Sequence, residues 1–259
     1  MNILDHNREA WNRESSAGGQ WSTPVSEEVI AEAKAGNWRV SLTPLLPVPK
    51  SWLGALKDKD VLCLASSGGQ QGPVLAAAGA RVVSFDLSEV QLQKDQLVAD
   101  RDNLDLRCVR GDMTDLSVFP SENFDLVFHA VSNVFVPDVE IVWKECFRVL
   151  KQNGALLAGF MNPSFFLFDH DESARTGKIE VKYKLPYAEP ASLDEARLHE
   201  IHETKRALEF SHSLESQIGG QIKAGFLIAG LYEDYWTDEI PLNAHSPSYI
   251  ATQAIKPRM

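Results

Sequence analysis

The chain has few cysteines, no long apolar run and fewer positive than negative charges. Its three cysteines, Cys63, Cys108 and Cys146, stand far apart within apolar stretches, which is typical of reduced core thiols and gives no metal-ligand spacing. No apolar run approaches the length of a membrane span. The N-terminal residues carry charges throughout, so they lack the apolar centre of a secretory signal. We therefore expect a soluble, cytoplasmic protein with no metal site and no membrane partner.

Positive charge is scarce over the whole chain. Lys and Arg number 25 and Asp and Glu 36 among 259 residues, which gives a formal net charge of −11. An acidic surface repels phosphate backbones over long range, although a local basic patch can exist within a negative total. A nucleic-acid partner is therefore disfavoured, and a chain of this length fits one large α/β domain with a modest insertion.

From residue 61 onward, strand and helix patterns alternate. The continuous apolar run "VLCLA" at 61–65 is typical of a strand that is covered on both faces. A helix that ends at Gly79 leads to a second strand, "RVVSFD", after which Ser88 and Gln91 match a capping box. Further strands are predicted at 106–112, 124–132, 155–160, 226–234 and 248–256, with helices at 139–150 and 213–225. This alternation predicts a Rossmann-like, doubly wound and mostly parallel α/β sheet with helices on both faces.

Four segments are expected along the chain. Residues 1–50 form an N-terminal helical cap and linker, 51–160 the core, 161–205 an insertion after the fifth strand, and 206–259 the C-terminal part of the core. The cap contains two helix patterns, at 5–14 and 26–36. Trp11, Trp21, Trp38 and the "SFFLFD" stretch of the insertion can form a lid over a ligand, or can anchor these segments to the core; both interpretations remain open.

The loop after the first strand is the main candidate for ligand binding. Ser66, Ser67, Gly68 and Gly69 are small, so a ligand can approach the backbone at the start of the next helix. Asp86 ends the second strand, where a carboxylate can accept hydrogen bonds from both ribose hydroxyls.

This loop does not read G-x-G-x-x-G, because Ala65 and Ser67 replace two glycines. That departure disfavours a pyrophosphate and favours a ligand with ribose but no phosphates, such as S-adenosylmethionine (SAM).

Five stretches together carry a resemblance to a known family. They are "VLCLASSGGQQG", "VSFDLSEVQL", "VRGDMTDL", "FDLVFHAVSNVFVPD" and "RVLKQNGALLAGF". These stretches resemble the motifs of class I SAM-dependent methyltransferases of the methyltransferase type 11 or ubiquinone/menaquinone methylase-like kind. The resemblance is clear over about residues 53–160 and loose over the last fifty. It implies a SAM cofactor and methyl transfer to an unidentified, small-molecule acceptor.

The resemblance also implies roles for individual residues. Asp86 would bind the ribose hydroxyls, and Asp112, in the turn that begins at Gly111, the adenine amino group. The remaining implied positions are Ala65, Ser67 and Gly69 along the methionine part, Leu87 and Met113 against the adenine, and His129 and Ala130 beside the methyl group. Cys63 stands where the family usually has an acid that helps hold the amino-acid end of SAM. Gln70 and Gln71 are the predicted replacements.

Two histidines are candidates for a catalytic base. Methyl transfer depends chiefly on alignment, and a base helps when the acceptor is a hydroxyl or a protonated amine. His129 at the end of the fourth strand and His212 before the late helix are the candidates, each with a structural role as the alternative. The residues also leave open a SAM-binding protein without transfer activity, an NAD-dependent oxidoreductase and an RNA methyltransferase.

Overall fold

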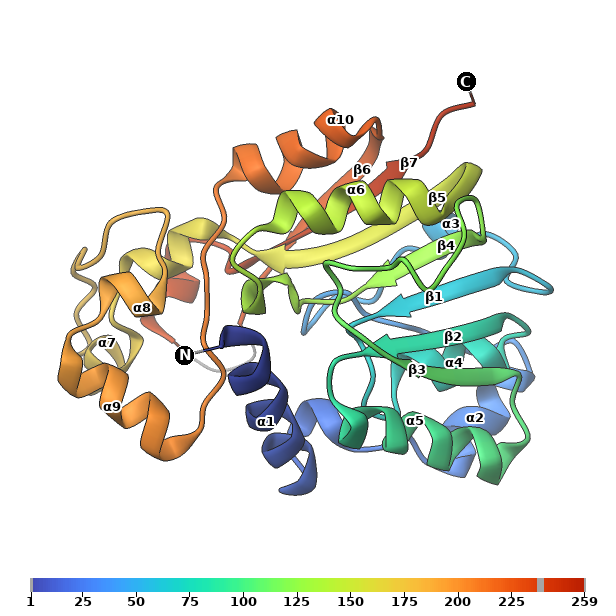
Figure 1. Cartoon of the computed structure of the whole chain (residues 1–259), viewed down its shortest axis with the longest axis horizontal. Helices are drawn as coiled ribbons and strands as arrows, with labels where there is room; N and C mark the ends of the chain where they lie inside the picture. The colour runs from blue at the N-terminus through green and yellow to red at the C-terminus, as the bar shows by residue number, and fades with distance from the viewer. Residues whose placement is uncertain (1, 237–239, 259) are drawn as a thin grey trace.

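The computed structural model describes residues 2–236 and 240–258. A central sheet lies between helices, and the carboxyl ends of its parallel strands point toward helix α1 (Figure 1). The helices α7, α8 and α9 lie beyond that edge, at the left of the same view. None of the helices over the described ranges has both the length and the apolar content for a membrane crossing.

The elements follow one another as the alternation predicts. The strands are β1 (Asp60–Leu64), β2 (Arg81–Asp86), β3 (Leu106–Arg110), β4 (Phe124–His129), β5 (Leu150–Met161), β6 (Leu227–Asp234) and β7 (Tyr249–Ile255). The α-helices are α1 (Ile3–Ser16), α2 (Glu27–Lys34), α3 (Lys50–Leu53), α4 (Gln71–Ala77), α5 (Glu89–Asp102), α6 (Val139–Val149), α7 (His170–Thr176), α8 (Glu189–Ser192), α9 (Glu195–Thr204) and α10 (Gly220–Ala224). Short 3-10 turns are η1 (Gln20–Ser22), η2 (Asn133–Phe135), η3 (Pro163–Leu167) and η5 (Pro241–Ala244), and η4 (Glu215–Gly219) is a π-helical turn.

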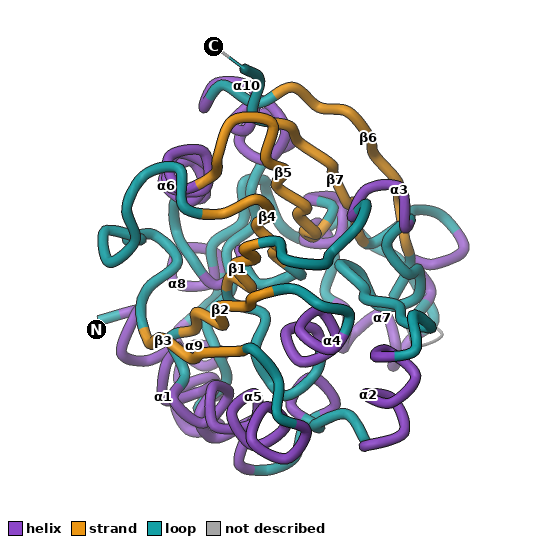
Figure 2. Tube along the Cα trace, turned by 90° about the vertical axis from the view of Figure 1, so that its right-hand side faces the viewer, coloured by secondary structure: helices purple, strands orange, loops and turns teal. Residues whose placement is uncertain are grey.

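The sheet has seven strands in the order β3-β2-β1-β4-β5-β7-β6 (Figure 2). The first five run parallel to one another, and β7 pairs antiparallel with both β5 and β6. Strand order reverses between β1 and β4, so a crevice opens there at the carboxyl ends. The predicted Rossmann-like, mostly parallel architecture is confirmed.

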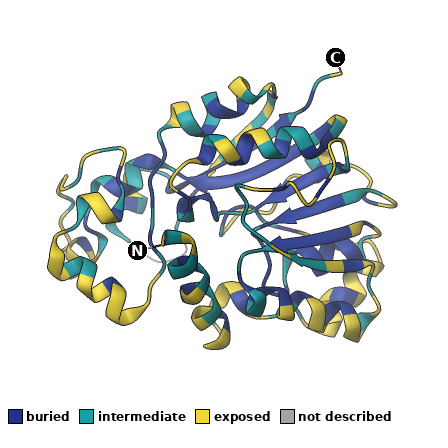
Figure 3. Ribbon diagram, in the orientation of Figure 1, coloured by how far each residue is buried: buried dark blue, intermediate teal, exposed yellow. Residues whose placement is uncertain are grey.

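Alternating side chains place two apolar layers against the two faces of the sheet. Val61 and Cys63 of β1 belong to one cluster, which includes residues of α2 and α4. Leu62 and Leu64 belong to the other, which includes Trp143 of α6. Because every second residue faces each layer, the central strands β1, β2 and β4 are buried along most of their length (Figure 3), as the continuous apolar run predicts, whereas the edge strands β3 and β6 are partly exposed.

The segment before β1 is packed against the core. Val40 and Leu42 are 2% exposed and belong to the same cluster as Val61. The Leu42 carbonyl accepts a hydrogen bond from Val131, and it lies so close to Gly159 that a side chain there would collide with it. Residues 40–48 therefore fix the N-terminal helices relative to the end of β4.

Two local predictions differ from the structure. The strand predicted at 155–160 begins earlier, at Leu150, so Asn153, at φ +62°, and Gly154 lie inside β5 as an irregularity. The late helix begins with the π-helical turn η4 and continues as the short α10. Gly220 occurs there because a Cβ would lie 2.8 Å from the Trp143 ring, so the helix approaches α6 closely.

Candidate functional site

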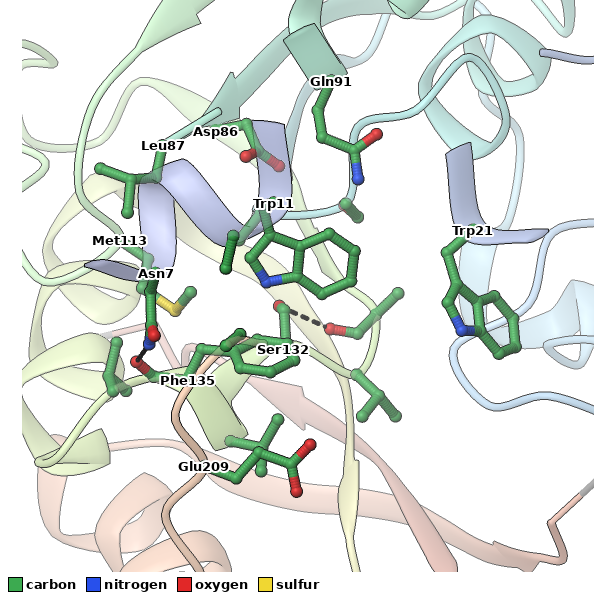
Figure 4. Close-up of a pocket in the computed structure, with 18 of the residues that line it drawn as sticks. Asn7, Trp11, Trp21, Asp86, Leu87, Gln91, Met113, Ser132, Phe135 and Glu209 are labelled. Atoms are coloured by element: carbon green, nitrogen blue, oxygen red, sulfur yellow. Dashed lines mark hydrogen bonds between the residues drawn. The ribbon is translucent and has the colours of Figure 1, made fainter. Parts of the chain in front are cut away.

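A cavity of about 1230 Å³ lies at the carboxyl ends of β1, β2 and β4. Helix α1, turn η1 and the stretch 204–209 supply its other walls. The close-up in Figure 4 shows Asp86, Leu87 and Gln91 at one end, with Phe135 and Glu209 at the other. This is the crevice that the reversal of strand order predicts.

We call the first side the strand-end wall, and its members lie at or just after the carboxyl ends of strands of the parallel sheet. They are Ala65, Ser66, Ser67, Asp86, Leu87, Gly111, Asp112, Met113 and Ala130. All of these were expected from the sequence to contact a cofactor. The structure brings them to one cavity because the carboxyl ends of parallel strands lie at the same edge.

Asp86, the last residue of β2, places a carboxylate on the strand-end wall. One carboxylate oxygen accepts a hydrogen bond of 2.9 Å from the Ser88 amide, and the other accepts one of 3.4 Å from the Ser67 amide. Burial raises the pKa of Asp86 to about 7, and these amides oppose part of that shift. Hydroxyl donors from a ligand would favour the ionised carboxylate, so Asp86 is suited to a ribose.

The loop between β1 and α4 is held by another acid, the buried Asp95 of α5. Its carboxylate oxygen accepts the amides of Gly69 at 2.6 Å and Gly68 at 3.2 Å, and the residue is fully buried. Cys63 faces the same region, since the Asp95 charge and burial both raise the pKa of its thiol. Asp95 is thus an acid close to Cys63, but it is not among the residues that line the cavity, and its carboxylate holds the loop.

Gly68 and Gly69 lie away from the cavity, beneath the N-terminal segment. A Cβ on Gly69 would lie 2.7 Å from Pro24, and one on Gly68 would collide with the Trp21 carbonyl. Gln70 lines the cavity, but its side-chain amide donates to the carbonyls of Gln20 and Thr23. These three residues therefore attach the cap to the loop, a role that the sequence did not indicate.

The turn after β3 places a carboxylate and a thioether on the wall. Asp112 accepts hydrogen bonds from the Thr114 amide at 3.0 Å and the Thr114 hydroxyl at 2.6 Å. Gly111 packs on Phe85, whose ring would overlap any Cβ at that position. The turn is therefore rigid, and it presents Met113 to the cavity (Figure 4).

Neither expected histidine lies on the cavity wall. His129 is fully buried, with Nδ1 2.9 Å from the Leu64 carbonyl oxygen and its ring against Trp143; burial lowers its pKa to about 4. His212 Nε2 lies 3.0 Å from the Asn133 carbonyl oxygen, and burial lowers its pKa as well. Both rings are held by backbone carbonyls, so the geometry favours their structural role.

The opposite side, which we call the distal wall, comes from distant parts of the chain. It consists of Val134, Phe135, Arg206, Glu209 and Tyr249. Glu209 and Arg206 also border a second cavity of about 480 Å³ beneath the insertion helices. Sequence reasoning missed Glu209; the one available signal is an acid between two apolar residues in "LEF", of which Leu208 is fully buried and Phe210 is 7% exposed.

Helix α1 joins the two walls. Asn7, 2% exposed, donates to the carbonyls of Phe135 and Leu208 and accepts the Leu208 amide at 2.8 Å. Trp11 stacks edge-on against Phe135, with ring centroids 5.1 Å apart, and projects between the walls (Figure 4). Trp11 and Trp21 line the cavity, as a lid would, whereas Trp38 belongs to the core.

Comparison with known proteins places the chain in a family. The family model described as "Methyltransferase domain" matches residues 62–158. The uncharacterized methyltransferase YbaJ of Bacillus subtilis (strain 168) is 48% identical over 254 residues, which cover 98% of each chain.

Two solved structures share the fold at low sequence identity. A SAM-dependent methyltransferase of Mesorhizobium loti aligns with a TM-score of 0.59 at 17% identity, covering 80% of this chain and 94% of its own. The 1,6-didemethyltoxoflavin-N1-methyltransferase of Burkholderia thailandensis aligns with a TM-score of 0.60 at 14% identity, covering 98% and 89%. The near full-length match to the Bacillus protein shows that the chain belongs to the methyltransferase family, and the two solved structures show that it has the fold of SAM-dependent methyltransferases.

Proposed function

We propose that this protein methylates a small molecule in the cavity between the strand-end wall and the distal wall, with SAM bound along the strand-end wall. The observation that carries the proposal is the single cavity of about 1230 Å³ that reaches from Asp86 to Glu209. A pocket for one drug-sized ligand is on the order of 300–1,000 Å³, so this cavity has room for a donor and an acceptor together.

The strand-end wall fits SAM in its chemistry. Asp86 supplies a carboxylate for the ribose hydroxyls, and Leu87 and Met113 supply apolar surface for the adenine. Asp112 can accept a hydrogen bond from the adenine amino group. Gln91 is the proposed further contact, because its Oε1 atom is buried without a hydrogen-bond partner and the residue lines the cavity. Nothing in this donor set requires a phosphate.

The remaining predicted residues have proposed roles along the same wall. Ala65, Ser66, Ser67 and Ala130 would contact the methionine part or the methyl group. Gly68, Gly69 and Gln70 would act indirectly, because they connect the loop to the N-terminal cap. His129 would support β4 from behind the wall.

SAM supplies a methyl group on a positively charged sulfur, so the protein's part is to align the acceptor and exclude water. Trp11, Phe135 and Tyr249 provide apolar and aromatic surface for that purpose. Residues 1–50 would act as a cap over the donor, and residues 161–205 as an insertion that shapes the acceptor side. The Burkholderia neighbour, whose structure holds 1,6-didemethyltoxoflavin and S-adenosylhomocysteine, supports a small-molecule acceptor.

We infer a cytoplasmic location from the three free cysteines. The net charge of −11 supports an acceptor other than nucleic acid.

Isothermal titration with S-adenosylhomocysteine (SAH), the demethylated product of SAM, tests the donor site. We expect binding to the wild type and about 10- to 100-fold weaker binding to Asp86→Asn, since a hydrogen bond to a charged group contributes about 1.5–3 kcal/mol. Glu89→Gln, on the first turn of α5, is the control and should bind as the wild type does. Tight binding of NAD with no binding of SAH would refute the proposal.

A further inference from the structure

Glu209 is held by its neighbours at a fixed place on the distal wall. The amides on either side are engaged, Leu208 with Asn7 at 2.8 Å and Phe210 with the Val134 carbonyl at 2.7 Å. The Glu209 amide donates to the carboxylate of Glu189 at 2.9 Å. These three amide hydrogen bonds fix the backbone around Glu209. Its side chain projects toward the cavity below Phe135, as Figure 4 shows.

The charge of Glu209 is incompletely neutralised. Arg206 forms its close ion pair with Glu189, whose side chain is 4% exposed, and lies 3.6 Å from a Glu209 oxygen. Two carboxylates therefore share one guanidinium, and the charge of Glu209 helps to raise the pKa of the Tyr187 and Tyr249 phenols, in both of which burial is the larger cause. Burial and the Glu189 charge raise the pKa of Glu209 to about 7, although 30% of its side chain stays exposed, and Arg206 opposes that shift.

The other carboxylates on the cavity wall either accept hydrogen bonds from nearby backbone or side-chain groups or are exposed. Asp86 and Asp112 accept hydrogen bonds from their own loops, and Asp138 caps α6 through the Glu140 amide. Glu14 is exposed on α1. Glu209 alone among the cavity-lining acids combines a distal position with a carboxylate that caps no turn or helix, within the part of the chain that the structure describes.

We propose that Glu209 is the base that takes the proton from the methyl acceptor, and that the acceptor is accordingly a hydroxyl or N–H compound. The inference rests on the proposed function of the same cavity. The acceptor oxygen or nitrogen forms its bond to the methyl carbon while the carbon–sulfur bond breaks and its electron pair stays on sulfur. The acceptor proton moves to a Glu209 oxygen, and the resulting carboxylic acid later releases it to water. A carboxyl that titrates near the working pH is suited to this exchange.

The activity test compares two probes, phenol and thiophenol, with labelled SAM at about pH 8. Phenol keeps its proton at that pH and needs a base, whereas thiophenol is already ionised and needs none. We expect Glu209→Gln to slow methylation of phenol by about 100-fold or more and to leave that of thiophenol unchanged. Glu209→Asp should restore part of the phenol activity.

The matched variant Glu189→Gln retains the base but removes its neighbouring charge and frees Arg206 to pair with Glu209. Both changes lower the pKa of Glu209, so the acidic limb of the pH profile for phenol should move to lower pH. A structural role for Glu209 would not move this limb.

A carbon-13 NMR titration of protein labelled at the glutamate carboxyl carbons gives a readout without turnover. We expect one resonance to titrate near pH 7 and to be absent from Glu209→Gln. In the activity test, the inference would be overturned by equal losses of activity for both probes, by no loss for phenol, or by wild-type transfer to neither probe. In the NMR titration, a Glu209 resonance that titrates in the ordinary glutamate range would overturn it. Absence of SAH binding to the wild type would instead contradict the proposed function itself.

Discussion

The two walls of the cavity differ in how the chain builds them. The strand-end wall comes from residues 65–130, where each member lies at or just after the end of a strand, so the backbone of the parallel sheet positions it. The distal wall combines residues 134–135, 206–209 and 249, and side-chain contacts with α1 and α8 hold it in place. The residues of a wall that the backbone positions can be predicted from local sequence patterns. Those of a wall assembled from side chains far apart in the sequence cannot.

The largest expected effect concerns the loop of the strand-end wall. Asp95→Ala leaves two buried amides, those of Gly68 and Gly69, without an acceptor, so the free energy of unfolding should fall by about 2–4 kcal/mol. Urea unfolding measures this loss, and SAH affinity should fall with it. Asp95→Asn is the matched control because it keeps an oxygen acceptor. Equal losses in the two variants would show that the charge, and not the hydrogen bonds, holds the loop.

Asp95 also shows where prediction from sequence reached its limit. The strand ends, the loop and Asp86 followed from alternation and spacing, and the replacement of an acid by Cys63 was visible. That Asp95 of α5 holds this loop depends on how the helix crosses the sheet, which no local pattern records. His129 shows the opposite case, in which the strand was predicted correctly and the side chain was not. Its position at the end of β4 predicted a place beside the cavity, but its ring packs on Trp143, away from the cavity. Glu209 was missed because four separate segments define its surroundings.

Asn7 offers a way to separate the two walls, because it connects α1 to the distal wall. Asn7→Ala removes three hydrogen bonds and leaves the buried Leu208 amide unpaired, so we expect about 1–3 kcal/mol lower stability. Helix α1 should also become sensitive to trypsin at Arg8 and Arg13. Glu9→Ala, on the exposed side of the same helix, serves as the control. If the two variants have the same free energy of unfolding, the hydrogen bonds of Asn7 to the distal wall do not contribute to stability.

The pH dependence of SAH binding should distinguish the walls by their acids. Ribose hydroxyls donate to the ionised form of Asp86, whose pKa is raised to about 7, so affinity is present above that pH and is lost below it. We expect about tenfold weaker binding at pH 6 than at pH 8, measured by titration calorimetry.

Asp86→Asn should abolish this pH dependence, whereas Glu209→Gln, which changes an acid with a similar pKa on the distal wall, should keep it. Persistence of the dependence in Asp86→Asn would assign it to another group, for which Asp95→Asn provides the direct check because its pKa is raised to about 6.

The smallest effect concerns Ala65, where the loop leaves β1. Its φ of +46° is a left-handed conformation that disfavours a side chain by about 1–2 kcal/mol, and glycine would relieve it at an entropic cost of about 0.4–1 kcal/mol in the unfolded chain. Ala65→Gly should therefore raise the unfolding free energy by about 0.5–1 kcal/mol. Ala77→Gly, the same change at the last residue of α4, should lower it by up to a similar amount. If both changes destabilise equally, the loop adjusts its backbone to alanine; opposite signs would show that the sheet imposes a glycine-like turn whichever residue occupies it.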